Sequence, residues 1–96
     1  MLYFAPVDNP KYSFEIAFGE YRLRLTVFRT ISGQFIDIYD VKTKKMVYAG
    51  QSIRHGANFF ACTPIKAIFM YVNISEIDPV DVESFLNGGF ILEPFI

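Results

Sequence analysis

The clearest pattern in the chain is an alternation of apolar and polar residues over positions 12–18 and again over 21–27, with Gly19-Glu20 between the two runs. A period of two is typical of β-strands with one buried face. A two-residue loop would pair every large apolar residue of the first run with one of the second, and would set Glu15 opposite Arg24. Because a shift of one residue would undo the match on both faces, the pattern predicts a β-hairpin in this register. Glycine at the first loop position predicts a type II′ turn.

A second hairpin is expected over positions 34–49. Residues 34–40 alternate, but aromatic side chains occupy the face that should be wet, and a polar turn separates them from a short return strand at 46–49. Residues 65–74 are apolar at nearly every position, which predicts a strand buried on both faces and leaves open a helix over 64–71.

The ends of the chain have distinct signals. Proline at positions 6 and 10 predicts an extended N-terminal arm over residues 1–11. Asp78-Pro79 has the chemistry of a helix start, with one or two turns expected to end near residues 87–89 and a last strand over 90–96. The sequence therefore predicts an all-β fold, a small antiparallel barrel or sandwich of five to six strands with one short helix, in which residues 12–96 form a single β domain.

Composition changes this picture in one respect. Hydrophobic residues make up 52% of the 96 positions and include eleven Phe and six Tyr. That is more apolar surface than one small core holds, so part of it is expected to be covered by a partner. A net charge of -1 supplies no general attraction to nucleic acid or to an anionic membrane.

Candidate chemistry is sparse. The chain has one cysteine, Cys62, and one histidine, His55, so neither an internal disulfide nor a zinc ligand set is expected. His55 would need a companion group to act as a general base, and Cys62 is expected to be a small buried apolar residue. We therefore expect no enzyme activity and no cofactor. The N-terminus lacks the pattern of a signal peptide, and no apolar run approaches the roughly 20 residues of a membrane span.

Acidic residues offer two further candidates. Asp78, Asp81 and Glu83 lack the spacing of a calcium loop, so helix capping is the simpler interpretation and no metal site is expected. Glu15 and Asp37 could form a catalytic carboxylate pair, but strand alternation places Glu15 opposite Arg24 instead.

Surface aromatic residues give the favoured functional prediction, which is a protein interface. Aromatic side chains are enriched at interfaces, and charged ones at the rim set the register. The predicted interface residues are Phe28, Phe35, Tyr39, Tyr48, Phe59 and Phe60, with Arg22, Arg24 and Asp37 at the rim.

Single-stranded nucleic-acid binding by a small OB-like protein is the alternative. Cationic residues are interleaved with the same aromatic ones, which is typical of single-strand-binding barrels. The residues concerned are Arg22, Arg24, Arg29, Lys42, Lys44 and Lys45. The slightly negative net charge disfavours this alternative.

The order "SFEIAFGEYRLRLTVF", "GQFIDIYDVKTKKMVYAGQSI", a Pro-Asp-Val turn and a final "GGFILEPFI" resembles the small baseplate plug proteins of simple contractile-tailed bacteriophages. The resemblance covers residues from about Tyr12 to the C-terminus, with Phe35 at the family's usual Trp. It implies a non-enzymatic virion component, made in the host cytoplasm, that docks in several copies on hub or tail-tube proteins of the baseplate. Residues 57–73 are more apolar than the family pattern.

Overall fold

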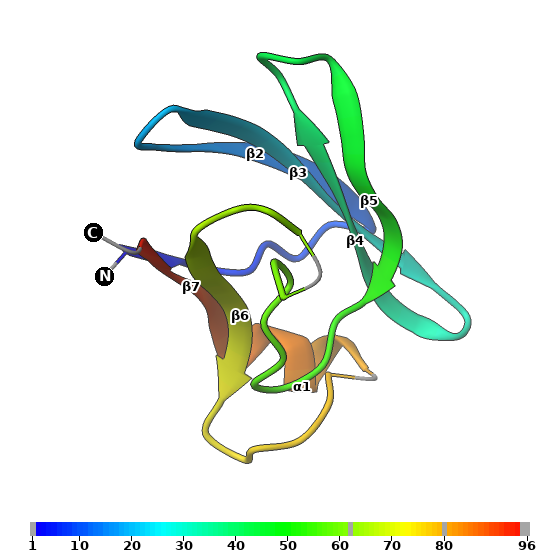
Figure 1. The fold of residues 1–96 in the computed structure, drawn as a ribbon. Coiled ribbons are helices and arrows are strands. Elements are labelled where there is room, and N and C mark those ends of the chain that lie inside the picture. The colour runs from blue at the N-terminus through cyan, green and yellow to red at the C-terminus, as the bar shows by residue number, and fades with distance from the viewer. Residues whose placement is uncertain (1, 62, 80, 95–96) are drawn as a thin grey trace. The chain divides into compact units, whose positions relative to one another are not determined.

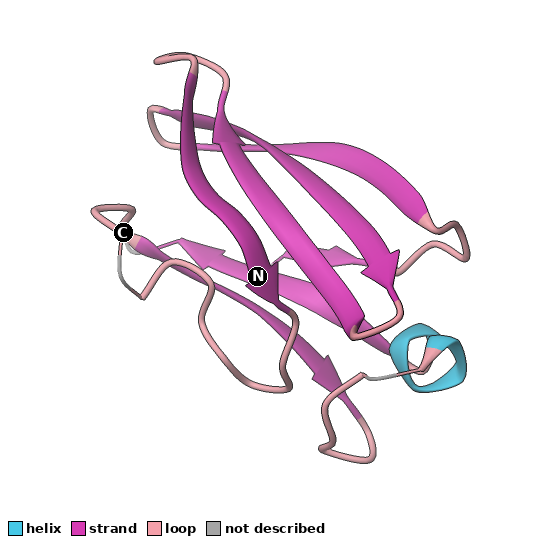
Figure 2. Cartoon of the chain, turned by 90° about the vertical axis from the view of Figure 1, so that its right-hand side faces the viewer, coloured by secondary structure: helices cyan, strands magenta, loops and turns pink. Residues whose placement is uncertain are grey.

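The computed structural model describes residues 2–61, 63–79 and 81–94, and its elements are strands and one short helix (Figures 1 and 2). The elements in chain order are β1 (Leu2–Phe4), β2 (Lys11–Phe18), β3 (Tyr21–Thr30), β4 (Gly33–Asp40), β5 (Lys45–Ser52), β6 (Ala67–Asn73), α1 (Val82–Leu86) and β7 (Gly88–Pro94). The strands form two antiparallel sheets, with the orders β1-β7-β6 and β2-β3-β4-β5. The predicted all-β fold with one short helix is confirmed. The described residues form seven strands where the sequence predicted five to six, because Leu2–Phe4 of the expected N-terminal arm pairs with β7.

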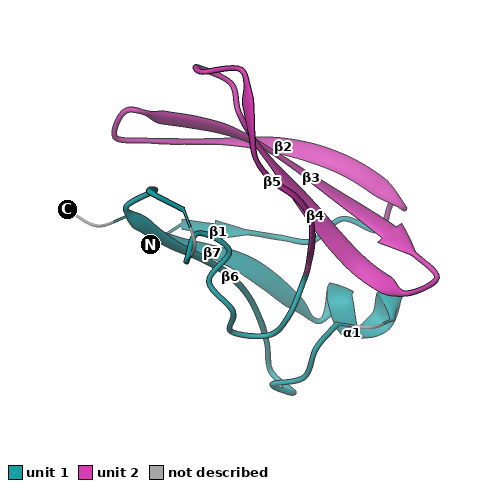
Figure 3. Ribbon diagram, turned by 45° about the vertical axis from the view of Figure 1, so that its right-hand side comes forward, with its two compact units in different colours: residues 1–8, 53–96 teal, residues 9–52 magenta. Residues whose placement is uncertain are grey.

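The chain divides into two compact units (Figure 3). The first unit comprises residues 1–8 and 53–96, and the second comprises residues 9–52. The expected N-terminal arm is itself divided between them, because β1 pairs with β7 through Leu2↔Leu92 while Asn9 begins the second unit.

The second unit is a four-stranded meander that begins with the predicted hairpin. The observed register of β2 and β3 runs from Lys11↔Phe28 to Phe18↔Tyr21 without a shift, so the sequence prediction is confirmed at every pair. Gly19 has φ +55, as its place in a type II′ turn requires.

One face of this sheet is buried and the other is partly exposed. The buried face carries aliphatic side chains that are at most 1% exposed, namely Leu23, Leu25, Val27, Ile36 and Ile38. At its far edge, β5 pairs with β4 irregularly, with two register shifts, and Gly50 has φ +65. The alternation in β3 and β4 thus produces one apolar face and one mixed face.

The first unit is built around an aromatic core. Phe59, Phe60 and Phe90 each pack against the ring of Phe69, with centroid separations of 5.5, 5.6 and 5.6 Å. β6 confirms the strand interpretation of residues 65–74 and excludes the helix. It is fully buried on one face only, since the side chains of Ile68, Met70 and Val72 are half-buried.

A loop before β6 covers the edge of that strand. The backbone N–H groups of Gly56 and Phe59 donate to the carbonyl oxygens of Tyr71 and Phe69, both at 2.8 Å. The Asn58 side-chain oxygen also accepts from the Phe69 N–H at 3.0 Å. These bonds satisfy backbone groups that would otherwise form an open sheet edge.

The helix begins later than the sequence indicated. Its N-cap is Asp81, whose Oδ1 accepts from the Ser84 N–H at 2.7 Å. Asp78, the expected cap, instead accepts from the His55 N–H at 3.0 Å. Both acids satisfy backbone donors, so capping was the right chemistry but Asp78 was the wrong residue for the helix.

Candidate functional site

The partly exposed face of the second unit carries most of the predicted interface residues. Phe28 and Phe35 are paired across β3 and β4, and their rings stack with centroids 5.7 Å apart and an interplanar angle of 23°. In another row of the same face, the guanidinium carbon of Arg24 lies 5.9 Å from the ring centroid of Tyr39. We call Arg24, Phe28, Phe35 and Tyr39 the aromatic face. It is extended by Met46, which pairs with Tyr39 and is 52% exposed.

The rows of the aromatic face arise directly from the strand register. Arg24, Thr26 and Phe28 alternate along β3 and pair with Tyr39, Asp37 and Phe35 of β4. Paired residues of adjacent strands point to the same face, so the two aromatic groups flank a central polar pair. The arrangement offers flat ring surfaces and one cation beside a carboxylate.

Charged residues around the aromatic face are engaged within the chain. Arg22 Nε donates to Glu15 Oε1 at 3.1 Å, and both side chains are largely exposed. The sequence predicted the pairing Glu15↔Arg24, and the register confirms it, but the ion pair forms diagonally with Arg22 while Arg24 lies over Tyr39. An exposed pair of this kind contributes little stability, so Arg22 is available to a partner at small cost.

Asp37, predicted at the rim of the interface, also has a structural role within the sheet. Its Oδ1 accepts from the Gly50 N–H at 2.6 Å, within the register shift between the pairs Ile36↔Gln51 and Ile38↔Tyr48. This bond replaces part of the interrupted ladder. The carboxylate therefore holds β5 beside β4 at this irregular position.

Three predicted aromatic residues do not belong to the aromatic face. Tyr48 pairs with Ile38, whose side chain is on the buried face, although Tyr48 itself is 37% exposed. Phe59 and Phe60 are 1% and 2% exposed because both rings pack in the core of the first unit. The expectation that Phe59 and Phe60 lie at an interface is wrong for this structure, since a loop flanking β6 turns both inward.

His55 is a structural residue in the geometry observed. Its Nδ1 accepts from the Asn73 N–H at 3.2 Å, and its own N–H donates to Asp78. The described residues contain no group of three His, Cys, Asp or Glu side chains that could hold a metal ion. Cys62 lies outside the described residues.

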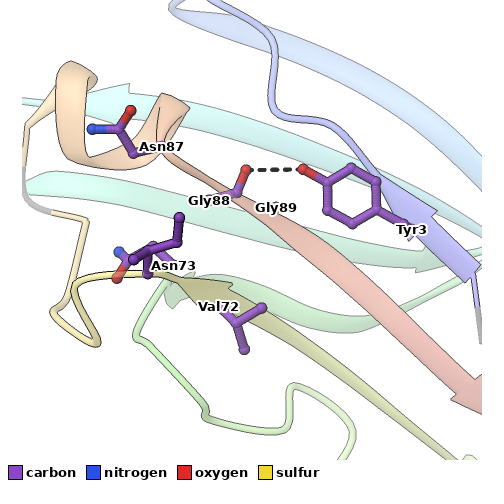
Figure 4. Close-up of a pocket in the computed structure, with 7 residues that line it drawn as sticks. Tyr3, Val72, Asn73, Asn87, Gly88 and Gly89 are labelled. Carbon is purple, nitrogen blue, oxygen red and sulfur yellow. Dashed lines mark hydrogen bonds between the residues drawn. The ribbon is translucent and has the colours of Figure 1, made fainter.

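A pocket of about 400 Å³ in the first unit was not anticipated from the sequence (Figure 4). Tyr3 lies at one side and its hydroxyl donates to the Gly88 carbonyl oxygen at 3.2 Å. The pocket is lined by Tyr3, Val72, Asn73, Ile74, Asn87, Gly88 and Gly89. The sequence predicts only a helix end at the Asn-Gly-Gly run, because nothing local indicates that Tyr3 lies beside it.

Asn73 supplies no free polar group to the pocket. Its side-chain nitrogen donates to the Ile77 carbonyl oxygen at 2.8 Å, and its oxygen accepts from the Ile77 N–H at 3.2 Å. Apart from the Asn73 and Asn87 amides and the Tyr3 hydroxyl, the pocket is lined by apolar side chains and backbone groups. We place the candidate site on the aromatic face instead.

Comparison with known proteins gives no identification. No protein-family model matches this chain, and no curated protein matches it. In the described part of the chain, no helix is both long and apolar enough to cross a membrane.

Proposed function

We propose that this chain is a structural, non-enzymatic protein that binds another protein through its aromatic face. The observation that carries the proposal is the partly exposed Phe28–Phe35 stack on the same sheet face as Arg24 and Tyr39. Aromatic and arginine side chains are the residue types that contribute most at protein interfaces. Aromatic rings bury large areas with little loss of side-chain freedom, and arginine adds several directed hydrogen-bond donors.

The partner class comes from the resemblance in sequence. A small β protein similar to contractile-tail baseplate plugs would act in the virion, in several copies, docked on hub or tail-tube proteins.

The test uses purified hub and tube proteins encoded by neighbouring genes. Their binding to the full chain is measured by interferometry, for the wild type and for Phe28→Ala and Tyr39→Ala. Each substitution should weaken binding at least about tenfold, as expected for a central aromatic residue worth more than about 1.4 kcal/mol. Tyr48→Ala is the matched control, since this tyrosine pairs with Ile38 on the other face.

Two results would contradict the proposal. If the wild-type protein binds none of these partners, the baseplate assignment is wrong. Equal losses for Tyr39→Ala and Tyr48→Ala contradict the aromatic face as the site.

Single-stranded nucleic acid is a second candidate ligand, favoured by one observation. Arg24 over the Tyr39 ring, beside two stacked Phe rings, presents stacking platforms with an adjacent cation. Glu15 and Asp37 on the same face oppose it, because they repel phosphates. A salt titration of oligonucleotide binding decides this alternative: absence of binding at about 50 mM salt, or no salt dependence, excludes it.

A further inference from the structure

The free edge of β2 has features of a pairing surface. Of the four edges in the described sheets, β5 is irregular, β1 has three residues and β6 is covered by the loop at residues 55–59. β2 pairs with β3 at eight consecutive positions without a shift. It is therefore the longest regular edge, and such edges are templates for a further strand.

The hairpin geometry identifies which backbone groups point outward. The two-residue loop makes Phe18↔Tyr21 a hydrogen-bonded pair, and such pairs alternate along an antiparallel ladder. Hence the N–H and C=O groups of Ser13, Glu15 and Ala17 point away from β3. All three residues are exposed, and no bond from these backbone groups to residues beyond the sheet is found in the described part of the chain.

We infer that two copies of this chain pair antiparallel along β2, about a twofold axis at Ser13. In that register Ser13 faces Ser13 of the second copy, and Lys11 faces Glu15 of the second copy at both ends. Directly opposed residues share a face, so each ammonium group meets a carboxylate. This inference is independent of the proposed baseplate role, since the partner is a second copy of the chain.

Charge favours this register over those centred on Glu15 or Lys11. Centring the pair on Glu15 would oppose two carboxylates, and centring it on Lys11 would oppose two ammonium groups. The other face also matches in the Ser13 register, because Tyr12 meets Phe14 of the second copy. Within one chain these two rings already stack, with centroids 6.2 Å apart.

Existing contacts leave room for the pairing. Glu15 uses Oε1 for Arg22, so Oε2 is available to a lysine. The Lys11 N–H donates to Asn9 Oδ1 at 3.1 Å. For a complete ladder between the two copies, the Lys11 N–H would have to exchange its bond to Asn9 for one to the second copy. The bonds between the two Ser13 residues, and those donated by the Glu15 N–H groups, form without this exchange. A lysine normally protects an edge from pairing, but here the opposing strand offers the opposite charge.

Sedimentation of the full chain over a range of concentrations tests the inference. The wild type should form a dimer. Ser13→Pro removes the central outward N–H without removing a bond to β3, and should weaken dimerisation at least about tenfold. Ser13→Ala is the matched control: it keeps the N–H, loses only the hydroxyl contact to Thr26 and should dimerise like the wild type.

Charge substitutions provide a second measurement that does not depend on proline. Lys11→Glu should weaken the dimer, and Glu15→Lys added to it should restore the dimer by reversing both charge pairs. Amide exchange locates the contact: the Ser13 N–H should become protected as concentration rises, whereas the Phe14 N–H, bonded to β3, should be protected throughout. A protein that is monomeric at every concentration overturns the inference, as does a dimer that both Ser13→Pro and Lys11→Glu leave unchanged.

Discussion

His55, considered as a general base, and Asp78 and Asp81, considered as metal ligands, each satisfy a backbone group. His55 Nδ1 accepts from Asn73, Asp78 accepts from the His55 N–H, and Asp81 caps the helix. Short polar side chains next to loops often serve in this way, because loop backbones leave donors without partners. The sequence indicated capping by acids but could not assign each acid to its donor.

Acid titration should reveal the Asp81 cap. The hydrogen bond from the Ser84 N–H lowers the pKa of the Asp81 carboxyl below its ordinary value of 3.8. The cap therefore stabilises the fold above that value and is lost as pH falls through the lower, folded pKa. Urea unfolding between about pH 2 and 6 should show a weaker pH dependence for Asp81→Asn than for the wild type. Glu20→Gln, in the exposed β2–β3 loop, is the control; equal slopes for wild type and Asp81→Asn would contradict the assignment.

Alkaline titration should reveal the contribution of the buried Tyr71 phenol to stability. Burial is the main cause that raises the pKa of its phenol above 10.0, and its hydroxyl lies 2.7 Å from the Phe85 carbonyl oxygen. Stability from the neutral phenol is fully present below pH 10.0 and is lost as pH rises through the folded pKa. Tyr71→Phe should lower the free energy of unfolding by about 1–2 kcal/mol at neutral pH. The stability of this variant should then decrease less steeply than that of the wild type as the pH rises into the alkaline range. Identical alkaline slopes in chemical denaturation would refute this role.

Elements differ in how completely local pattern determines them. The β2–β3 hairpin follows from alternation and one glycine, because its contacts are between neighbours in sequence. The shifts in β5 have no such local signal, since they depend on the Asp37 bond to Gly50 from another strand. Likewise β1 became a strand only because β7 is present to pair with it.

Gly89 should be required for the docking of β1. A Cβ built on Gly89 would overlap the ring of Tyr3, which lies across β7 at this point. Gly89→Ala should therefore destabilise the protein by about 1–3 kcal/mol and increase amide exchange in residues 2–4. In a Tyr3→Ala background the same substitution should cost much less, as a double-mutant cycle measured by urea unfolding would show. Equal costs in both backgrounds would exclude this contact.

At the scale of the molecule, aromatic residues divide into core and surface groups that sequence alone did not separate. Phe59→Ala should lower the free energy of unfolding by about 3–5 kcal/mol, because it leaves a cavity beside Phe69. Phe28→Ala should cost only about 1–2 kcal/mol, since its ring is partly exposed and loses mainly the stack with Phe35. Thermal and urea unfolding of the two variants measure the difference; similar losses would mean that Phe28 belongs to the core.

The sequence by itself determined the all-β class, the first hairpin with its register, and the excess of aromatic side chains. These follow from period-two patterning, turn chemistry and composition, which act locally or as sums over the chain. Only the tertiary structure decided that Phe59 and Phe60 turn inward, that Tyr48 pairs with Ile38 and that Arg24 lies over Tyr39. Those outcomes depend on which distant strands become neighbours, and no local pattern carries that information.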